Sequence, residues 1–75
     1  MPSYIVNRNA QFNSGDHEVH VSPQSSCRSP QYPEPHNQEF LGVFPTCHDA
    51  VREAKRRGYA KANGCYYCAN PCHTG

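Results

Sequence analysis

The C-terminal end of this chain reads CYYCANPCHTG and places three cysteines and a histidine within nine residues, Cys65 to His73. Two further cysteines, Cys27 and Cys47, lie upstream. A chain of 75 residues buries only a modest fraction of its surface, so its hydrophobic core is marginal unless a metal ion or disulfides reinforce it. The five cysteines therefore constrain the possible fold more than any other feature of the sequence.

The supply of apolar side chains is small. There is no Trp and only one Met, and the long aliphatic residues are Ile5 and Leu41 together with a few valines. Five Tyr and three Phe must carry much of the buried area. Length and composition together predict one small domain, residues 1–75, that needs a covalent or metal link for stability.

The N-terminus has no charged leader and no apolar segment typical of an export signal, and no stretch is long enough to cross a bilayer. These features predict a cytoplasmic protein, in which thiols stay reduced. An odd number of cysteines would also leave one thiol over in a framework made only of disulfides. Both arguments favour metal binding over disulfides, inert thiols or redox chemistry.

The pattern of residues predicts an α+β fold, with a small antiparallel sheet of three to four strands and one helix packed on it. Residues 3–7 and 17–21 are rich in β-forming residues and predict a hairpin. A third strand is expected at 39–44, and a last short strand at 64–67. The helix is expected to begin after Thr46, a favourable N-cap, and to end at Gly58.

Residues 22–37 contain four prolines, which exclude a helix interior or a central strand. This segment is therefore predicted to be a long loop. Long loops in compact domains are usually functional or tethered. Cys27 lies near the start of the loop, and coordination of its sulfur to a metal ion would be one way to order the segment.

Cys65 and Cys68 form a C-x2-C pair after Asn63-Gly64, which is typical of a zinc knuckle. Zinc prefers four tetrahedral ligands, and a knuckle normally needs two more from elsewhere in the chain. The preferred set of zinc ligands consists of Cys47, Cys65, Cys68 and Cys72. Cys27 and His73 are possible substitutes in this set.

Other interpretations of the cysteines and histidines fit the sequence less well. Cys65 and Cys68 lack the helix N-terminus and βαβ context expected of a thioredoxin-like redox pair, and the spacing before His73 does not match a haem attachment site. His17 and His20 lie three apart in a predicted strand, so they face opposite ways and cannot chelate one ion together. We expect one to be half-buried and the other exposed, although a single one could complete a metal site.

The expected helix carries most of the positive charge of the chain. Residues 46–75 hold five Lys or Arg and two Asp or Glu, although the formal net charge of the whole chain is only +1. A basic face beside tyrosines is a candidate surface for a protein or a nucleic acid, but near-neutral charge weakens the nucleic-acid case. The residues predicted to bind a partner are Arg52, Lys55, Arg56, Arg57, Tyr59 and Lys61.

The stretches GDHEVH (15–20), LGVFPTCHDAVREAK (41–55) and NGCYYCANPCHT (63–74) resemble small uncharacterised proteins of bacteria and mobile elements. Very small proteins of this type are often carried by phages, where some inhibit host defence complexes by occupying a binding surface. No catalytic constellation is visible in the sequence. The expected function is therefore a non-enzymatic zinc-stabilised module that binds a protein partner, such as a defence complex. The alternative is a nucleic-acid-binding zinc module.

Overall fold

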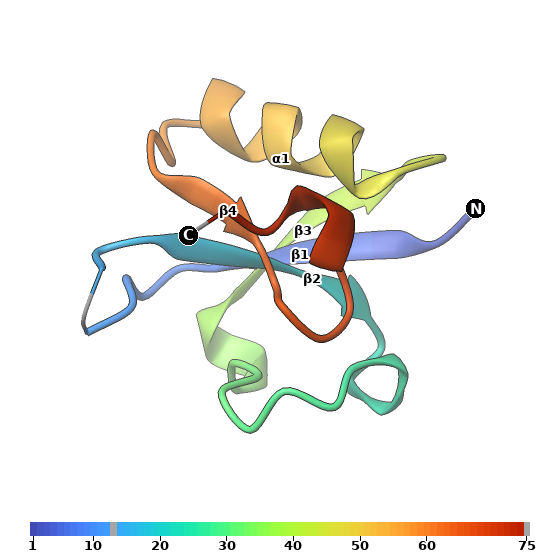
Figure 1. Cartoon of the computed structure of the whole chain (residues 1–75), viewed down its shortest axis with the longest axis horizontal. Helices are drawn as coiled ribbons and strands as arrows, with labels where there is room; N and C mark the ends of the chain where they lie inside the picture. Colours follow the sequence, from blue (N-terminus) through green and yellow to red (C-terminus); the bar gives the residue numbers. More distant parts are fainter. Residues whose placement is uncertain (13, 75) are drawn as a thin grey trace.

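The computed structural model describes residues 1–12 and 14–74 and shows a four-stranded sheet with one helix packed on it (Figure 1). The predicted α+β fold, with its cysteine-containing C-terminal region, is confirmed. The elements are β1 (Ser3–Asn7), β2 (His17–Ser22), β3 (Gln38–Val43), α1 (Cys47–Arg56) and β4 (Ala62–Gly64).

The strands are arranged in the order β3-β1-β2-β4. β1 pairs antiparallel with both β2 and β3, and β2 pairs in parallel with β4, so the sheet is mixed rather than wholly antiparallel as the sequence pattern predicted. The reason lies in the helix. Because α1 crosses over the sheet between β3 at one edge and β4 at the other, the chain returns to β4 in the direction of β3, which is also the direction of β2.

One face of the sheet packs against α1. Val6 and Val19 from the two central strands are fully buried there, together with Ala50 and Ala54 from the helix. The small alanine side chains let the helix backbone approach the sheet closely. The helix begins after Thr46 as predicted, although the Thr46 side chain makes no capping hydrogen bond.

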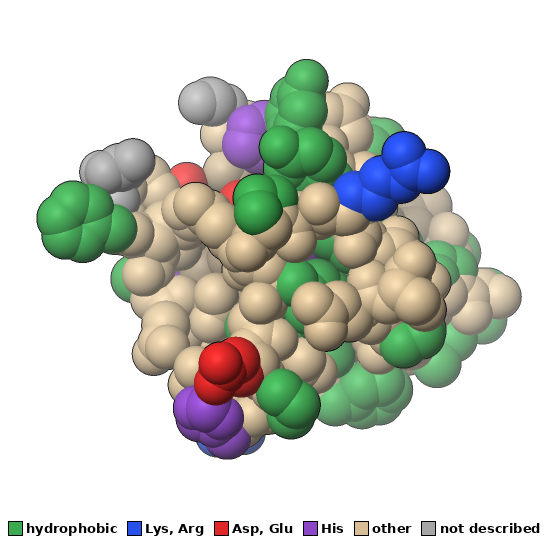
Figure 2. All heavy atoms as spheres, turned by 90° about the horizontal axis from the view of Figure 1, so that it is seen from below, with side chains coloured by type: hydrophobic (Ala, Val, Ile, Leu, Met, Phe, Trp, Pro, Cys, Tyr) green, Lys and Arg blue, Asp and Glu red, His purple; other side chains and the backbone are tan. Residues whose placement is uncertain are grey.

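The opposite face of the sheet is covered by the proline-rich loop, which lies below the sheet in Figure 1. The loop includes two short 3-10 turns, Gln24–Ser26 and Pro35–Asn37. Its Tyr32 hydroxyl donates a hydrogen bond to the carbonyl oxygen of Val21 at 3.1 Å. Figure 2 views the molecule from this side and shows a surface mainly of backbone and uncharged polar atoms, with few charged side chains.

The last strand is shorter and earlier than expected. β4 ends at Gly64, and Cys65 begins the turn that was predicted to be its continuation. After that turn the chain folds back onto β4, where the Asn63 amide donates to the Thr74 carbonyl oxygen at 2.9 Å. The Thr74 backbone N–H donates in return to the Asn63 side-chain oxygen at 2.9 Å. These bonds fix the C-terminal segment against the sheet edge.

Gly64 is needed for this close approach. A Cβ atom at this position would lie 2.6 Å from both the Ala69 carbonyl oxygen and the Cys72 Cβ atom. Because both neighbours belong to or adjoin the backbone of the returning segment, neither can yield without moving the segment itself.

We therefore expect Gly64→Ala to destabilise the fold by about 1–3 kcal/mol, the usual cost of overpacking. The measurement is the midpoint of urea unfolding. Ser25→Ala, at an exposed position in the first 3-10 turn, serves as the control and should leave the midpoint unchanged. An unaltered midpoint for Gly64→Ala would show that the C-terminal segment is not packed against β4.

Candidate metal centre

Four side chains with metal-ligating atoms meet on the loop side of the sheet. They are His20 from β2, Cys27 from the proline-rich loop, and Cys65 and Cys68 from the turn after β4, and their donor atoms all lie within 4.8 Å of one another. His20, Cys27 and Cys65 are buried, and Cys68 is half-buried. The arrangement can hold a metal ion through one nitrogen and three sulfur atoms.

The distances between the donor atoms are short. The sulfur atoms of Cys27 and Cys65 are 3.6 Å apart. The Nδ1 atom of His20 lies 3.7 Å from the Cys27 sulfur and 3.9 Å from the Cys68 sulfur. The imidazole nitrogen therefore points toward the sulfur atoms from the strand side.

Each sulfur atom also accepts a hydrogen bond from a backbone N–H group. Ser29 donates to Cys27 and Tyr67 donates to Cys65, both at 3.4 Å and both from two residues further along the chain. The Val21 N–H donates to the Cys68 sulfur at 3.2 Å. Donors aimed at sulfur favour the thiolate form, which is the form that binds metal.

The three thiols influence one another strongly. A hydrogen bond from Cys68, followed by one from His20 and two from backbone groups, holds the pKa of Cys65 well below its usual range. The same bond to Cys65, together with burial, raises the pKa of Cys68, and burial raises the pKa of Cys27. A thiolate at one cysteine thus disfavours ionisation of the neighbouring thiols, because a second negative charge beside it would have no counter-charge.

The other nitrogen of His20 faces a carboxylate. Its Nε2 atom is buried and has no hydrogen-bond partner among the residues that the structure describes, and the Glu18 Oε1 atom lies 3.6 Å away. Metal-ligating histidines usually direct their second ring N–H group at a carboxylate, a carbonyl or a water. Glu18 and His20 share one face of β2, so the strand pattern places the carboxylate beside the imidazole. Burial raises the pKa of Glu18.

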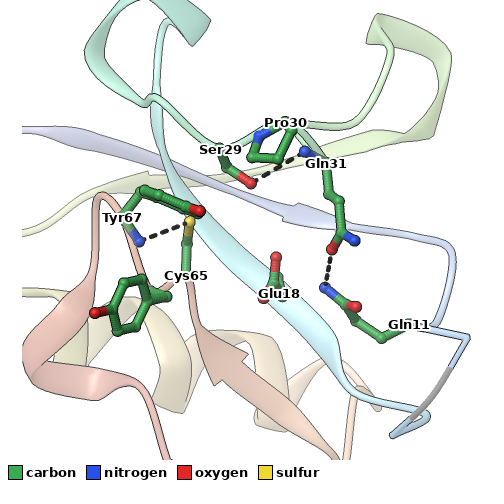
Figure 3. A pocket seen from close by; sticks show the side chains of 8 residues that line it. Gln11, Glu18, Ser29, Pro30, Gln31, Cys65 and Tyr67 are labelled. Atoms are coloured by element: carbon green, nitrogen blue, oxygen red, sulfur yellow. Dashed lines mark hydrogen bonds between the residues drawn. The ribbon is translucent and has the colours of Figure 1, made fainter.

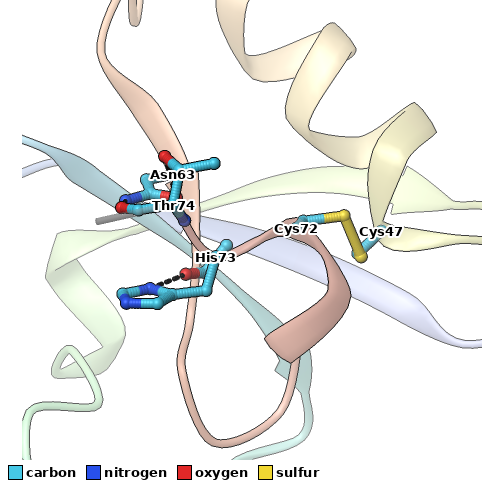
Figure 4. Close-up of a disulfide and its surroundings, with 6 residues drawn as sticks. Cys47, Asn63, Cys72, His73 and Thr74 are labelled. Carbon is cyan, nitrogen blue, oxygen red and sulfur yellow. Dashed lines mark hydrogen bonds between the residues drawn. A yellow bond between two sulfur atoms is a disulfide. The ribbon is translucent and has the colours of Figure 1, made fainter.

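Cys47 and Cys72 do not join this cluster. Their sulfur atoms form a disulfide that links the first residue of α1 to the C-terminal segment, as Figure 4 shows. The prediction that all four of Cys47, Cys65, Cys68 and Cys72 surround one ion is therefore not what the structure shows: only Cys65 and Cys68 lie in the cluster. The reason is that the returning segment carries Cys72 toward the helix while the turn before it faces the loop.

The disulfide also bears on the predicted environment. Disulfides are typical of oxidising compartments, so this bond does not fit the reduced thiols that were expected of a cytoplasmic protein. Within residues 1–12 and 14–74, no helix is both long and apolar enough to span a membrane.

Two other histidines, His73 and His17, have contacts of a different kind. His73, a predicted substitute ligand, lies with its Nδ1 atom 3.0 Å from the Gly64 carbonyl oxygen and its ring edge-to-face with Tyr66. His17 is half-buried, with Nδ1 2.9 Å from the Asn7 carbonyl oxygen. The expectation of one exposed strand histidine was wrong, because the loop covers His20 and neighbouring side chains cover part of His17.

The sequence pattern placed Cys27 only among the substitute ligands, and it left open whether either His17 or His20 completes the site. The signal that was available for His20 is the shared strand face of Glu18 and His20, which pairs an imidazole with a carboxylate. What the sequence lacked was the position of the proline-rich loop, which folds back over β2 and brings Cys27 to the imidazole.

Several residues predicted to bind a partner instead make contacts within the fold. Arg57 donates to Glu53 at 2.7 Å and to Glu39 at 3.0 Å, and the Tyr59 hydroxyl donates to Glu39 at 2.6 Å. Lys61 donates to the Ser14 carbonyl oxygen at 2.6 Å. These three side chains tie α1 and the segment after it to the sheet and its loops.

The exposed arginines of α1 have acidic neighbours one turn away. Arg56 forms a two-pronged pair with Glu53, at 2.8 and 2.6 Å, and Arg52 lies 3.3 Å from Asp49. The guanidinium groups beside Glu53 lower its pKa to about 2. Much of the positive charge of the helix is therefore offset locally.

A hollow of about 280 Å³ lies beside the cysteine cluster. Figure 3 shows Glu18 in the middle of it, with Cys65 and Tyr67 on one side and Gln11 and Gln31 on the other. The remaining lining residues are Ser29, Pro30 and Tyr66.

Comparison of the chain with protein-family models, with curated proteins and with solved structures finds no match. Any account of function therefore depends on the residues and geometry described above.

The disulfide should contribute to the stability of the fold independently of the cysteine cluster. Replacing both cysteines in Cys47→Ala/Cys72→Ala removes a crosslink between residues 25 apart, so we expect a loss of about 3 kcal/mol in the free energy of unfolding. The measurement is urea unfolding of the variant beside wild-type protein, with and without reductant. Wild-type stability that does not change on reduction would contradict the assignment of this disulfide.

Proposed function

We propose that this chain is a non-enzymatic zinc-binding module that acts by binding a protein partner. The observation that carries the proposal is the convergence of His20, Cys27, Cys65 and Cys68, which supply the four donors of a Cys3His zinc site. Three segments distant in sequence, β2, the proline-rich loop and the turn after β4, meet at this cluster, so a bound ion would stabilise the fold as well as the turn.

The distances support zinc. Typical bond lengths of about 2.3 Å to sulfur and about 2.0–2.1 Å to nitrogen place two sulfur ligands of a tetrahedral ion roughly 3.8 Å apart, and sulfur and nitrogen roughly 3.6 Å apart. The corresponding distances are 3.6 Å between Cys27 and Cys65, and 3.7 and 3.9 Å from His20 to Cys27 and Cys68. Three thiolates and one imidazole are also a donor set that zinc prefers over the hard cations.

The same donor set supports a structural role for the ion. Catalytic zinc sites commonly have three protein ligands and an open position for water or substrate, whereas structural sites have four protein ligands. Here four side chains provide the full tetrahedral set and three of them are buried. The ion would hold the proline-rich loop and the C-terminal turn against β2.

Exposed aromatic side chains support a protein partner. Tyr66 and Tyr67, between the two cysteines of the turn, are 59% and 57% exposed, and their rings meet edge-to-face with centroids 5.4 Å apart. Tyrosine is enriched in protein interfaces because it offers a large contact area at small entropic cost. Binding through these rings to a host defence complex, and so inhibiting it, is one role that such a surface could serve.

The nucleic-acid alternative has weaker support. Affinity for nucleic acids depends on free cations that neutralise phosphates. Arg56 and Arg57 share Glu53, Arg52 lies beside Asp49, and the formal net charge of the chain is +1.

The metal site makes a direct prediction. Wild-type protein should contain one zinc ion per chain, and His20→Ala, Cys27→Ser, Cys65→Ser and Cys68→Ser should each lose most of it, because each removes one of four ligands. The measurement is elemental analysis, supported by absorption spectra of the cobalt-substituted protein. Cys47→Ala/Cys72→Ala is the matched control and should keep one ion per chain.

The opposite pattern would contradict the proposed ligand set. If the control variant lost its zinc and Cys27→Ser retained it, the ligands would be those that the sequence pattern first favoured. Well-folded wild-type protein that contains no zinc would end the zinc-module proposal.

A second prediction separates the two classes of partner. Fluorescent single-stranded and duplex oligonucleotides should show no saturable binding at physiological salt, because the arginines of α1 and its C-cap are paired with acids. Binding that weakens steeply with salt, and loses part of that dependence in Arg52→Ala/Arg56→Ala, would favour the nucleic-acid alternative instead.

A further inference from the structure

The hollow beside the cysteine cluster is lined by an acidic side chain and by no basic one. Among the described residues that line it, Glu18 is the only carboxylate, and none is Lys, Arg or His. Its side chain is 14% exposed, and Figure 3 places it at the centre of the hollow. An anionic group in a partly enclosed site favours a cationic ligand.

A second negative charge would adjoin this carboxylate, and this step rests on the proposed function. Cys65 lines the hollow and also belongs to the cluster. One divalent zinc ion with three thiolates and a neutral imidazole has a net charge of −1. The loaded site would therefore add to the field of Glu18 rather than offset it.

Aromatic rings form one wall of the hollow. Tyr66 and Tyr67 line it, and more than half of each side chain is exposed. Rings in this position can stack on a planar cation, an interaction that arginine makes more often than lysine.

Polar groups on the opposite side are held in place. The Gln11 side-chain nitrogen donates to the Gln31 side-chain oxygen at 3.0 Å, and the Ser29 hydroxyl accepts from the Gln31 backbone N–H at 3.1 Å. This pairing leaves the Gln11 side-chain oxygen as an acceptor for a ligand. The hollow volume of about 280 Å³ is several times the roughly 30 Å³ of a water molecule, which is room for a guanidinium group and its aliphatic stem.

We propose that this hollow binds the guanidinium group of an arginine side chain presented by the protein partner. Glu18 would pair with the guanidinium, Tyr67 would stack on it, and the Gln11 oxygen would accept one of its remaining N–H groups. Arginine fits better than lysine because its planar, five-donor head can pair with a carboxylate and stack on a ring at the same time.

The test uses short peptides on zinc-loaded protein. The probe is acetyl-Gly-Arg-Gly-amide, and the comparison peptides replace Arg by Lys or by Gln. Backbone amide NMR shifts report where each binds. We expect saturable shifts at Glu18, Gln31 and Tyr67 with the arginine peptide, weaker binding with lysine, and no saturation with glutamine.

Variants assign the contacts. Tyr67→Ala should weaken arginine-peptide binding about threefold, as expected for the loss of an exposed cation–π contact. Glu18→Gln, measured after its zinc content is confirmed, should abolish the preference for arginine over glutamine. Phe40→Ala is the control, since Phe40 is an equally exposed aromatic residue on β3 outside the hollow, and it should bind as wild type does.

The outcomes distinguish the two proposals. Protein that carries one zinc ion but binds all three peptides alike, or shows its shifts along α1, would overturn the arginine site and leave the zinc module intact. Folded protein without zinc would overturn the module. Arginine-selective shifts around Glu18 in that zinc-free protein would show that the hollow works without the ion.

Discussion

The meeting of His20, Cys27, Cys65 and Cys68 is the contact on which the loop side of this molecule depends. The proline-rich loop contributes few apolar side chains to the core, so its links to the sheet are this cluster and polar contacts such as the Tyr32 hydrogen bond to Val21. The contact also aligns the turn after β4, which brings Cys65 and Cys68 to the side of β2 that the loop covers. A cluster of donors thus takes the place of a hydrophobic layer on one face of the sheet.

The other face is held by different means. Small alanine side chains bring α1 close to the central strands, and the Cys47–Cys72 disulfide links the start of the helix to the C-terminal segment. Buried apolar area in so small a domain stabilises only weakly. The two faces therefore share the C-terminal segment: the disulfide fixes it to the helix, and the turn before it joins the donor cluster.

This shared segment gives the proposed functions a common basis. The exposed tyrosines lie between Cys65 and Cys68, so whatever fixes the two sulfur atoms also restrains the backbone that carries the aromatic rings. A restrained backbone loses less conformational entropy when a partner binds. The basic helix has no comparable arrangement, because Glu53 and Glu39 engage its C-terminal arginines within the fold.

Local sequence rules determined most of the elements of this protein. Alternation of β-formers located β1 and β2, proline excluded regular structure from 22–37, and the Thr46 and Gly58 positions bounded the helix, because these rules depend on neighbouring residues alone. The C-x2-C spacing likewise singled out Cys65 and Cys68, whose sulfur atoms meet in one turn.

Only the tertiary structure decided which of the five cysteines form the disulfide and which belong to the donor cluster. Cys47 and Cys72 became partners because the segment after the turn runs back toward the helix, and Cys27 met His20 because the loop folds under β2. The parallel pairing of β4 was decided in the same way, by the crossing of α1 from one sheet edge to the other. Spacing along the chain specifies ligands that share a turn, but contacts between distant segments depend on where the backbone carries them.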